Sequence, residues 1–180
     1  MIHNTLLTIQ LWPSHHLPAT VRQEIISLCN RAYEEEMEAL LKTFTNATHL
    51  LGYYNGQLVS HALWVTRYLQ SGTGRQLRTA YVEAVATDPP YRNRGFATAI
   101  MQRLVSEILD YDLAALSPFN VVYYARLGWE LWRGPLFIRQ NDQLLPSPSD
   151  EEVMIFRLPK TPTLALEAPL SAEWREGELW

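Results

Sequence analysis

Hydrophobic and polar positions follow two different periods along the chain, and their order predicts the fold class. Alternating or short apolar runs predict strands at residues 5–12, 49–54, 57–68, 77–87, 113–116, 129–132, 136–139 and 153–158. Apolar residues at helical spacing predict helices at 18–32, 35–43, 96–108 and 118–128. The pattern predicts a mixed α/β fold in one domain over residues 1–180, with 141–150 as a loop and 153–158 as the last strand.

Three turn signals fix element ends within this pattern. Asn55-Gly56 between two strand segments predicts a tight hairpin. Ser117-Pro118 has the form of a helix N-cap followed by proline at the first helical position. Gly128 is suited to end that helix, because glycine accepts the left-handed backbone that commonly follows a last helical turn.

The stretch from Leu77 to Ile108 is organised as a strand, a turn and a helix. Asp88-Pro89-Pro90 ends the strand, and Arg92 to Thr98 leads into an amphipathic helix that reaches Ile108. The first N–H groups of a helix have no partner within it, and with the helix dipole they favour an anion. The stretch therefore predicts a pyrophosphate-binding turn; the alternative is an ordinary corner between a strand and a helix.

Composition and charge narrow the possible partners. The net charge is −4 and no long basic cluster occurs, which argues against nucleic acid. No apolar run is long enough to cross a membrane and no signal peptide is recognised, so we expect a cytoplasmic protein. The single cysteine, Cys29, is expected to be a buried apolar residue. The histidines lack the paired spacing of zinc ligands, so no metal is expected, and His61 is interpreted as a hydrogen-bonded core residue.

Arg92-x-x-Gly95-x-Ala97 resembles the acetyl-coenzyme A signature, Arg/Gln-x-x-Gly-x-Gly/Ala, of the GNAT superfamily of N-acetyltransferases. The resemblance implies a central, mostly antiparallel sheet that splays after its fourth strand and is flanked by helices. It also implies that acetyl-CoA is the co-substrate. The cofactor-binding residues would be Val85, Ala86, Thr87, Arg92, Asn93, Arg94, Gly95, Phe96, Ala97 and Thr98.

Transfer of an acetyl group to an amine needs a base for the amine and a proton for the departing thiolate. Strand alternation places Tyr81, Glu83, Val85 and Thr87 on one face, so Glu83 is the candidate base, directly or through water. It can instead bind the substrate cation without moving a proton. In the GNAT pattern a tyrosine at the spacing of Tyr124 before Gly128 lies near the thioester sulfur, and Tyr124 is the candidate acid or else a packing residue.

Several blocks further resemble the aminoglycoside 2′-N-acetyltransferases. They are Tyr81-Val82-Glu83-x-Val85-Ala86, Ala115-Leu116-Ser117, Leu127-Gly128-Trp129, Phe156-x-Leu158-Pro159 and the end from Trp174 to Trp180. The resemblance implies that the tail, residues 159–180, folds back to the substrate pocket. The substrate-binding residues would be Glu35, Glu83, Ala84, Ser117, Glu151, Glu152, Glu178 and Trp180, the last through its carboxylate.

Charge supports a polycationic substrate. Three short segments, 34–38, 150–152 and 173–178, hold ten of the nineteen acidic residues. Carboxylates that converge on one cleft would attract several ammonium groups. Two alternatives stay open: a GNAT enzyme for another small polyamine, peptide amine or amino sugar, and a non-catalytic protein that binds acyl-CoA or a polycation. A homodimer is a further alternative that the sequence leaves open.

Overall fold

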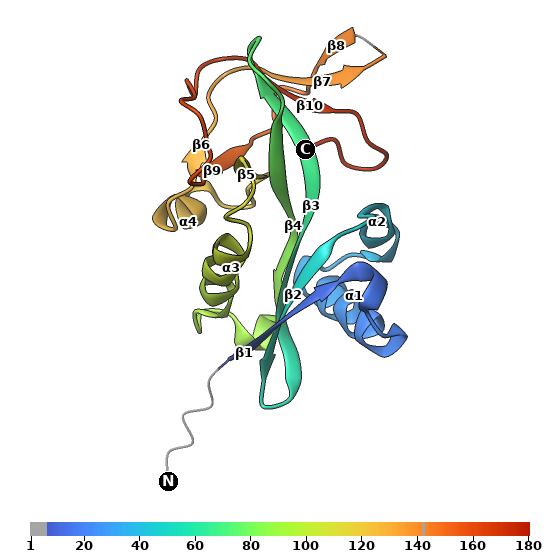
Figure 1. Ribbon diagram of the computed structural model, residues 1–180. Helices are drawn as coiled ribbons and strands as arrows, with labels where there is room; N and C mark the ends of the chain where they lie inside the picture. The colour runs from blue at the N-terminus through green and yellow to red at the C-terminus, as the bar shows by residue number, and fades with distance from the viewer. Residues whose placement is uncertain (1–6, 142) are drawn as a thin grey trace. The chain divides into compact units, whose positions relative to one another are not determined.

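The computed structural model describes residues 7–141 and 143–180 (Figure 1). It has the mixed α/β fold that the sequence predicts. The chain divides into two units: unit 1 comprises Met1–Val65 and Glu83–Glu107, and unit 2 comprises Thr66–Val82 and Ile108–Trp180. Strands β3 (Gln57–Ser71) and β4 (Leu77–Thr87) therefore contribute one part to each unit. No helix among these described residues is long and apolar enough to cross a membrane.

Unit 1 is built from antiparallel strands with helices on both sides. Its further elements are β1 (Thr8–Pro13), α1 (Ala19–Tyr33), α2 (Glu38–Thr43), β2 (Thr48–Tyr54) and α3 (Phe96–Glu107), with single 3₁₀ turns at Ser14–His16 and Pro89–Tyr91. β1 pairs with β2 and β2 with β3, both antiparallel. Within this unit α1 and α2 lie on one side of the strands and α3 on the other (Figure 1).

The sequence pattern predicts unit 1 closely, because its elements are local and periodic. Asn55 and Gly56 both have positive φ, 51° and 77°, which is the backbone of the tight hairpin turn expected there. The buried residues of α1, among them Ile25, Leu28 and Cys29, follow the helical register. The predicted first strand begins at Thr5, which lies outside the described residues.

Unit 2 is a mixed sheet of short strands. Its further elements are β5 (Leu113–Leu116), α4 (Val121–Arg126), β6 (Glu130–Leu131), β7 (Leu136–Gln140), β8 (Gln143–Pro146), β9 (Met154–Arg157) and β10 (Leu170–Glu173). The strand order is β6-β9-β5-β4-β3-β10-β7-β8. The pairs β4–β5 and β10–β7 are parallel, whereas β5–β9, β6–β9, β7–β8 and β3–β10 are antiparallel.

Three predictions in unit 2 are wrong. The helix predicted from Pro118 begins at Val121, because the side chain of Asn120, not that of Ser117, accepts the N–H of Tyr123 and caps it. The segment predicted as a loop contains β8, which pairs with β7. Strand β9 is not the last, because β10 from the proline-rich tail lies between β3 and β7.

Candidate functional site

The end of β4 in unit 1 is held by a buried carboxylate. Asp88 is buried, and its two oxygens accept from Nη2 and Nε of Arg31 at 2.7 and 3.1 Å. Its backbone N–H donates to Val59 O on β3 at 2.9 Å. The 3₁₀ turn Pro89–Tyr91 follows at once. The strand therefore ends at a fixed point, which sets the position of the turn that follows.

That turn has the geometry of an anion site. Asn93 and Gly95 have positive φ, 61° and 80°. A Cβ added at Gly95 would meet no atom within 4 Å, so there is open space over this backbone. The first helical bond of α3 runs from Ala99 N–H to Gly95 O at 3.0 Å. By helix geometry the N–H groups of Phe96, Ala97 and Thr98 precede the i to i−4 bonds of α3 and are directed toward its N-terminal end, the orientation that phosphate binding needs.

The two arginines of this turn differ in what they contact. Arg92 donates from Nη2 to Ala32 O at 2.7 Å and from Nε to Thr87 O at 3.4 Å. Its side chain therefore ties the turn to the end of α1. Arg94 is exposed and lies over the ring of Tyr91, with 5.1 Å from Cζ to the ring centroid. Both arginines are exposed, but two nitrogens of the Arg92 guanidinium are already engaged by backbone carbonyls.

Strand β4 carries a backbone irregularity at Ala84, whose φ is 49°. A non-glycine residue in the left-handed region is strained by about 1–3 kcal/mol and persists only where its surroundings hold it. The predicted alternation of Tyr81, Glu83, Val85 and Thr87 on one face assumes an extended backbone, so it does not extend across Ala84. Glu83 is buried just before this point, with 9% of its surface exposed.

Three successive carbonyls at this irregularity accept hydrogen bonds from side chains of unit 1. The bonds are His61 Nδ1–H to Ala84 O at 2.8 Å, Tyr33 Oη–H to Val85 O at 3.1 Å and Ser60 Oγ–H to Ala86 O at 3.1 Å. Side-chain donors therefore hold the backbone where β4 departs from extended geometry. Sequence reasoning missed this arrangement, although it did predict a hydrogen-bonded core role for His61, which is confirmed.

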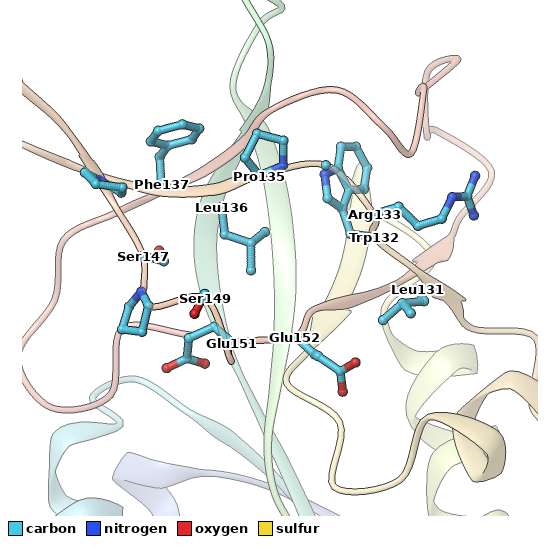
Figure 2. A pocket seen from close by; sticks show the side chains of 13 residues that line it. Leu131, Trp132, Arg133, Pro135, Leu136, Phe137, Ser147, Ser149, Glu151 and Glu152 are labelled. Carbon is cyan, nitrogen blue, oxygen red and sulfur yellow. The ribbon is translucent and has the colours of Figure 1, made fainter.

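Unit 2 contains a pocket of about 380 Å³ that lies between two segments of the chain. It is lined by residues 131–137 and by Pro146, Ser147, Pro148, Ser149, Glu151 and Glu152. Figure 2 shows the carboxylates of Glu151 and Glu152 on the side away from the rings of Phe137 and Trp132. Burial raises the pKa of Glu151, and the nearby charges of Asp150 and Glu178 raise it further. Glu178 of the third acidic segment is therefore close enough to act on Glu151, which lines the pocket.

A buried arginine anchors the C-terminal segment of unit 2. Arg67 is 1% exposed and donates to Leu179 O at 2.6 Å and to Glu173 O at 2.7 Å. Its guanidinium lies 4.9 Å from the ring centroid of Tyr81. Trp180 is buried and donates from Nε1 to Ser147 Oγ at 2.6 Å, and Ser147 lines the pocket. Sequence reasoning missed Arg67, because an arginine in a strand gives no sign of burial.

The remaining candidates are Tyr124, Ser117 and Glu35. Tyr124 of α4 is buried and packs edge-to-face on Trp129, with ring centroids 6.2 Å apart. Burial raises the pKa of its hydroxyl, and Tyr123 adds to the rise, so the hydroxyl keeps its proton at neutral pH. Ser117 is exposed before α4, and Glu35 is exposed between α1 and α2. In the part of the chain that the structure describes, no group of three or more His, Cys, Asp or Glu side chains is placed to hold a metal.

Comparison with known proteins agrees with this geometry. Residues 15–132 match the family model of the acetyltransferase (GNAT) domain. A curated relative, the aminoglycoside 2′-N-acetyltransferase of Mycolicibacterium fortuitum, is 35% identical over 134 residues, which cover 71% of this chain and 68% of that protein.

Solved structures share the fold at lower identity. The N-acetyltransferase YhbS of Escherichia coli, solved with CoA, has a TM-score of 0.67 and 18% identity, and the match covers 96% of this chain and 91% of that one. A GNAT acetyltransferase of Brucella melitensis, solved with acetyl-CoA, has a TM-score of 0.52 and 14% identity over 68% of this chain and 83% of that one. Several other structural neighbours are longer, and this chain spans about a third of their length. On the strength of the family match and the 35% identical relative, the chain belongs to the GNAT family of acetyltransferases.

Proposed function

We propose that the protein transfers the acetyl group of acetyl-CoA to the 2′-amine of an aminoglycoside. The observation that carries the substrate class is a pocket in unit 2 that is lined by Glu151 and Glu152, with Asp150 and Glu178 close enough to act on Glu151. An aminoglycoside carries several ammonium groups, and grouped carboxylates bind such a ligand with complementary charge. The relative from Mycolicibacterium fortuitum is a 2′-N-acetyltransferase, which supports the 2′-amine as the acetylated group.

In unit 1 the turn before α3 would bind the coenzyme. The N–H groups of Phe96, Ala97 and Thr98 and the guanidinium of Arg94 would hold the pyrophosphate, and the open space at Gly95 leaves room for it. Backbone groups of Val85 to Thr87 would pair with the pantetheine arm. The bound coenzyme supplies an activated acetyl thioester.

Two side chains would move protons. The amine attacks the thioester carbonyl only in its neutral form, so Glu83 accepts a proton from the ammonium, directly or through one water. The amine nitrogen would then bond to the carbonyl carbon, the carbon–sulfur bond would break, and the nitrogen would release its second proton, which restores the hydroxyl of Tyr124 through solvent after that group has protonated the thiolate. Tyr124 donates its hydroxyl proton to the departing thiolate; its raised pKa means that it is protonated when this happens.

In unit 2 the acids would bind the rest of the sugar. Glu151, Glu152 and Glu178 would each face an ammonium group, and Trp180 would hold the C-terminal segment against Ser147. Each exposed carboxylate adds a modest binding free energy, and where the ligand desolvates a carboxylate the cost of desolvation offsets part of the gain. Ser117 and Glu35 would add polar contacts outside this cluster.

A pair of kanamycins tests the proposal directly. Kanamycin B carries an amine at the 2′ position where kanamycin A carries a hydroxyl, and the two are otherwise identical. We expect release of free thiol from acetyl-CoA, and a product heavier by one acetyl group, with kanamycin B only. Turnover of both compounds, or of spermidine instead of either, would favour the GNAT enzyme for another amine. Tight binding of kanamycin B by calorimetry without any product would favour the non-catalytic alternative.

A further inference from the structure

A buried chain of hydrogen bonds in unit 1 ends at the irregular residue of β4. Ser14 Oγ lies 2.9 Å from His49 Nε2, His49 Nδ1 lies 3.0 Å from His61 Nε2, and His61 Nδ1 lies 2.8 Å from Ala84 O. His49 is 7% exposed and His61 is fully buried. Both histidines have lowered pKa values, about 3 for His49 and about 4 for His61, because burial disfavours their charged forms. The two imidazoles are therefore neutral at pH 7.

The Ala84 carbonyl determines which nitrogen of each imidazole in this chain carries the proton. Ala84 O can only accept, so His61 carries its proton on Nδ1 and has a bare Nε2. That nitrogen accepts from His49 Nδ1–H, which leaves His49 Nε2 to accept from Ser14 Oγ–H. Ser14 Oγ also lies 2.9 Å from Ala47 O, which accepts the Ser14 backbone N–H at 2.8 Å and has a second lone pair for the hydroxyl. If the hydroxyl proton went there, two bare imidazole nitrogens would face each other, so the neutral chain has one direction.

This chain also determines where the next N–H points. The peptide bond between Ala84 and Val85 is planar and trans, so the Val85 N–H points opposite to the Ala84 carbonyl. Because His61 holds the carbonyl on its own side, the N–H is held pointing away from His61. The pairing of β4 with β5 runs from Thr79 to Tyr81, and Val85 lies beyond its last pair.

We propose that His61, supported by His49 and Ser14, is a positioning residue that fixes the Ala84–Val85 peptide so that the Val85 N–H donates to the acetyl carbonyl of acetyl-CoA. The inference rests on the proposed function for the coenzyme, not on the identity of the amine. A donor fixed in advance stabilises the negative charge that develops on the carbonyl oxygen during attack. Without the bond from His61, the strained φ of Ala84 loses the contact that maintains it.

Two substitutions of His61 separate this role from packing. His61→Asn keeps an N–H donor at the Nδ1 position, toward Ala84 O, but removes the acceptor for His49. His61→Gln keeps an acceptor near the Nε2 position and removes the donor to Ala84 O. We expect kcat of His61→Asn within about threefold of the wild type, and kcat of His61→Gln lower by about 10- to 100-fold, because one orienting contact of an oxyanion donor is lost. Equal losses in both variants would overturn the inference.

Spectroscopy of the bound coenzyme gives a readout that packing alone does not move. The infrared stretch of acetyl-CoA labelled with ¹³C at the carbonyl should shift to lower frequency on binding to the wild type and to His61→Asn, and this shift should be lost in His61→Gln. In the unsubstituted protein the amide proton of Val85 should move downfield with acetyl-CoA but not with CoA, so the inference is testable even if the variants do not fold.

The outcomes also separate this inference from the proposed function. If kanamycin B is not acetylated but the carbonyl shift depends on the donor of residue 61 as described, the substrate proposal fails and the positioning role stands. If the wild type shows no carbonyl shift, no change at Val85, or no binding of acetyl-CoA, the positioning role is overturned.

Discussion

Replacing Arg67 by methionine tests how the C-terminal segment of unit 2 is held. The substitution keeps most of the apolar stem and removes the guanidinium, with its bonds to Leu179 O and Glu173 O and its 3.6 Å ion pair with the Glu173 carboxylate. A hydrogen bond from a charged donor contributes about 1.5–3 kcal/mol. Burying a guanidinium is itself unfavourable, which offsets part of that gain.

The partners that remain decide the net magnitude. Breaking a buried ion pair by removing one member destabilises by about 3–5 kcal/mol when the other charge is left buried. The charge of Glu173 would not be left buried, because its side chain is 37% exposed and its Oε2 still accepts the Tyr68 N–H at 3.0 Å. The estimate therefore falls at the lower end of that range. We expect Arg67→Met to lower the free energy of unfolding by about 3 kcal/mol.

Two assays with one control measure this loss. Urea unfolding followed by tryptophan fluorescence gives the free energy, and trypsin cleavage after Arg175 reports opening of the C-terminal segment. If the loss is confined to that segment, cleavage should accelerate about 100-fold, since each 1.4 kcal/mol is a factor of ten. Arg75→Met removes an exposed pair with Asp112 in the same unit and should change neither measurement. Equal behaviour of the two variants would refute the anchoring role of Arg67.

Three shorter predictions follow from the site. Glu83→Gln should lower kcat about 100-fold with little change in CoA affinity measured by calorimetry, and an unchanged pH–rate profile would remove Glu83 as the base. Glu178→Gln should raise the KM for kanamycin B about fivefold at unchanged kcat, whereas Glu176→Gln should not. The pKa values of His49 and His61 are lowered in the folded state, so the unfolded state binds more protons below pH 6.5. The free energy of unfolding from urea curves should therefore fall by about 2 kcal/mol per histidine from pH 7 to pH 5. The double variant His49→Gln/His61→Asn should depend less on pH over this range.

Local chemistry explains which elements the sequence predicts well. The sequence predicts β4, the turn before α3 and α3 itself, because each has a signal that acts within a few residues. These signals are the alternation of the strand, two prolines and a glycine. The Asn55-Gly56 turn belongs to the same class. The predicted start of α4 is wrong because two residues are suited to cap the helix. The choice of Asn120 over Ser117 depends on the path of the chain rather than on propensity.

The missed features all depend on contacts between distant segments. Strand β10 is four residues long and pairs with β3 and β7, so nothing in its own sequence marks it as a strand. Ala84 gives no sign of positive φ, as glycine would, because its conformation is imposed by its surroundings. The burial of His61 is predictable from strand alternation, but its carbonyl partner is not.

The acidic residues of unit 2 show how repulsion between carboxylates in the free protein can favour binding of a cation. Burial raises the pKa of Glu151, and the charges of Asp150 and Glu178 raise it further, so both of these carboxylates repel Glu151 in the free protein. Such repulsion is unfavourable for folding, and stability alone would favour its removal. A cation that binds among them relieves the repulsion and lowers the pKa of Glu151, so part of the binding free energy comes from strain already present. A ligand with several ammonium groups relieves more of it than one with a single amine, and this difference is the physical basis of the proposed polycationic substrate.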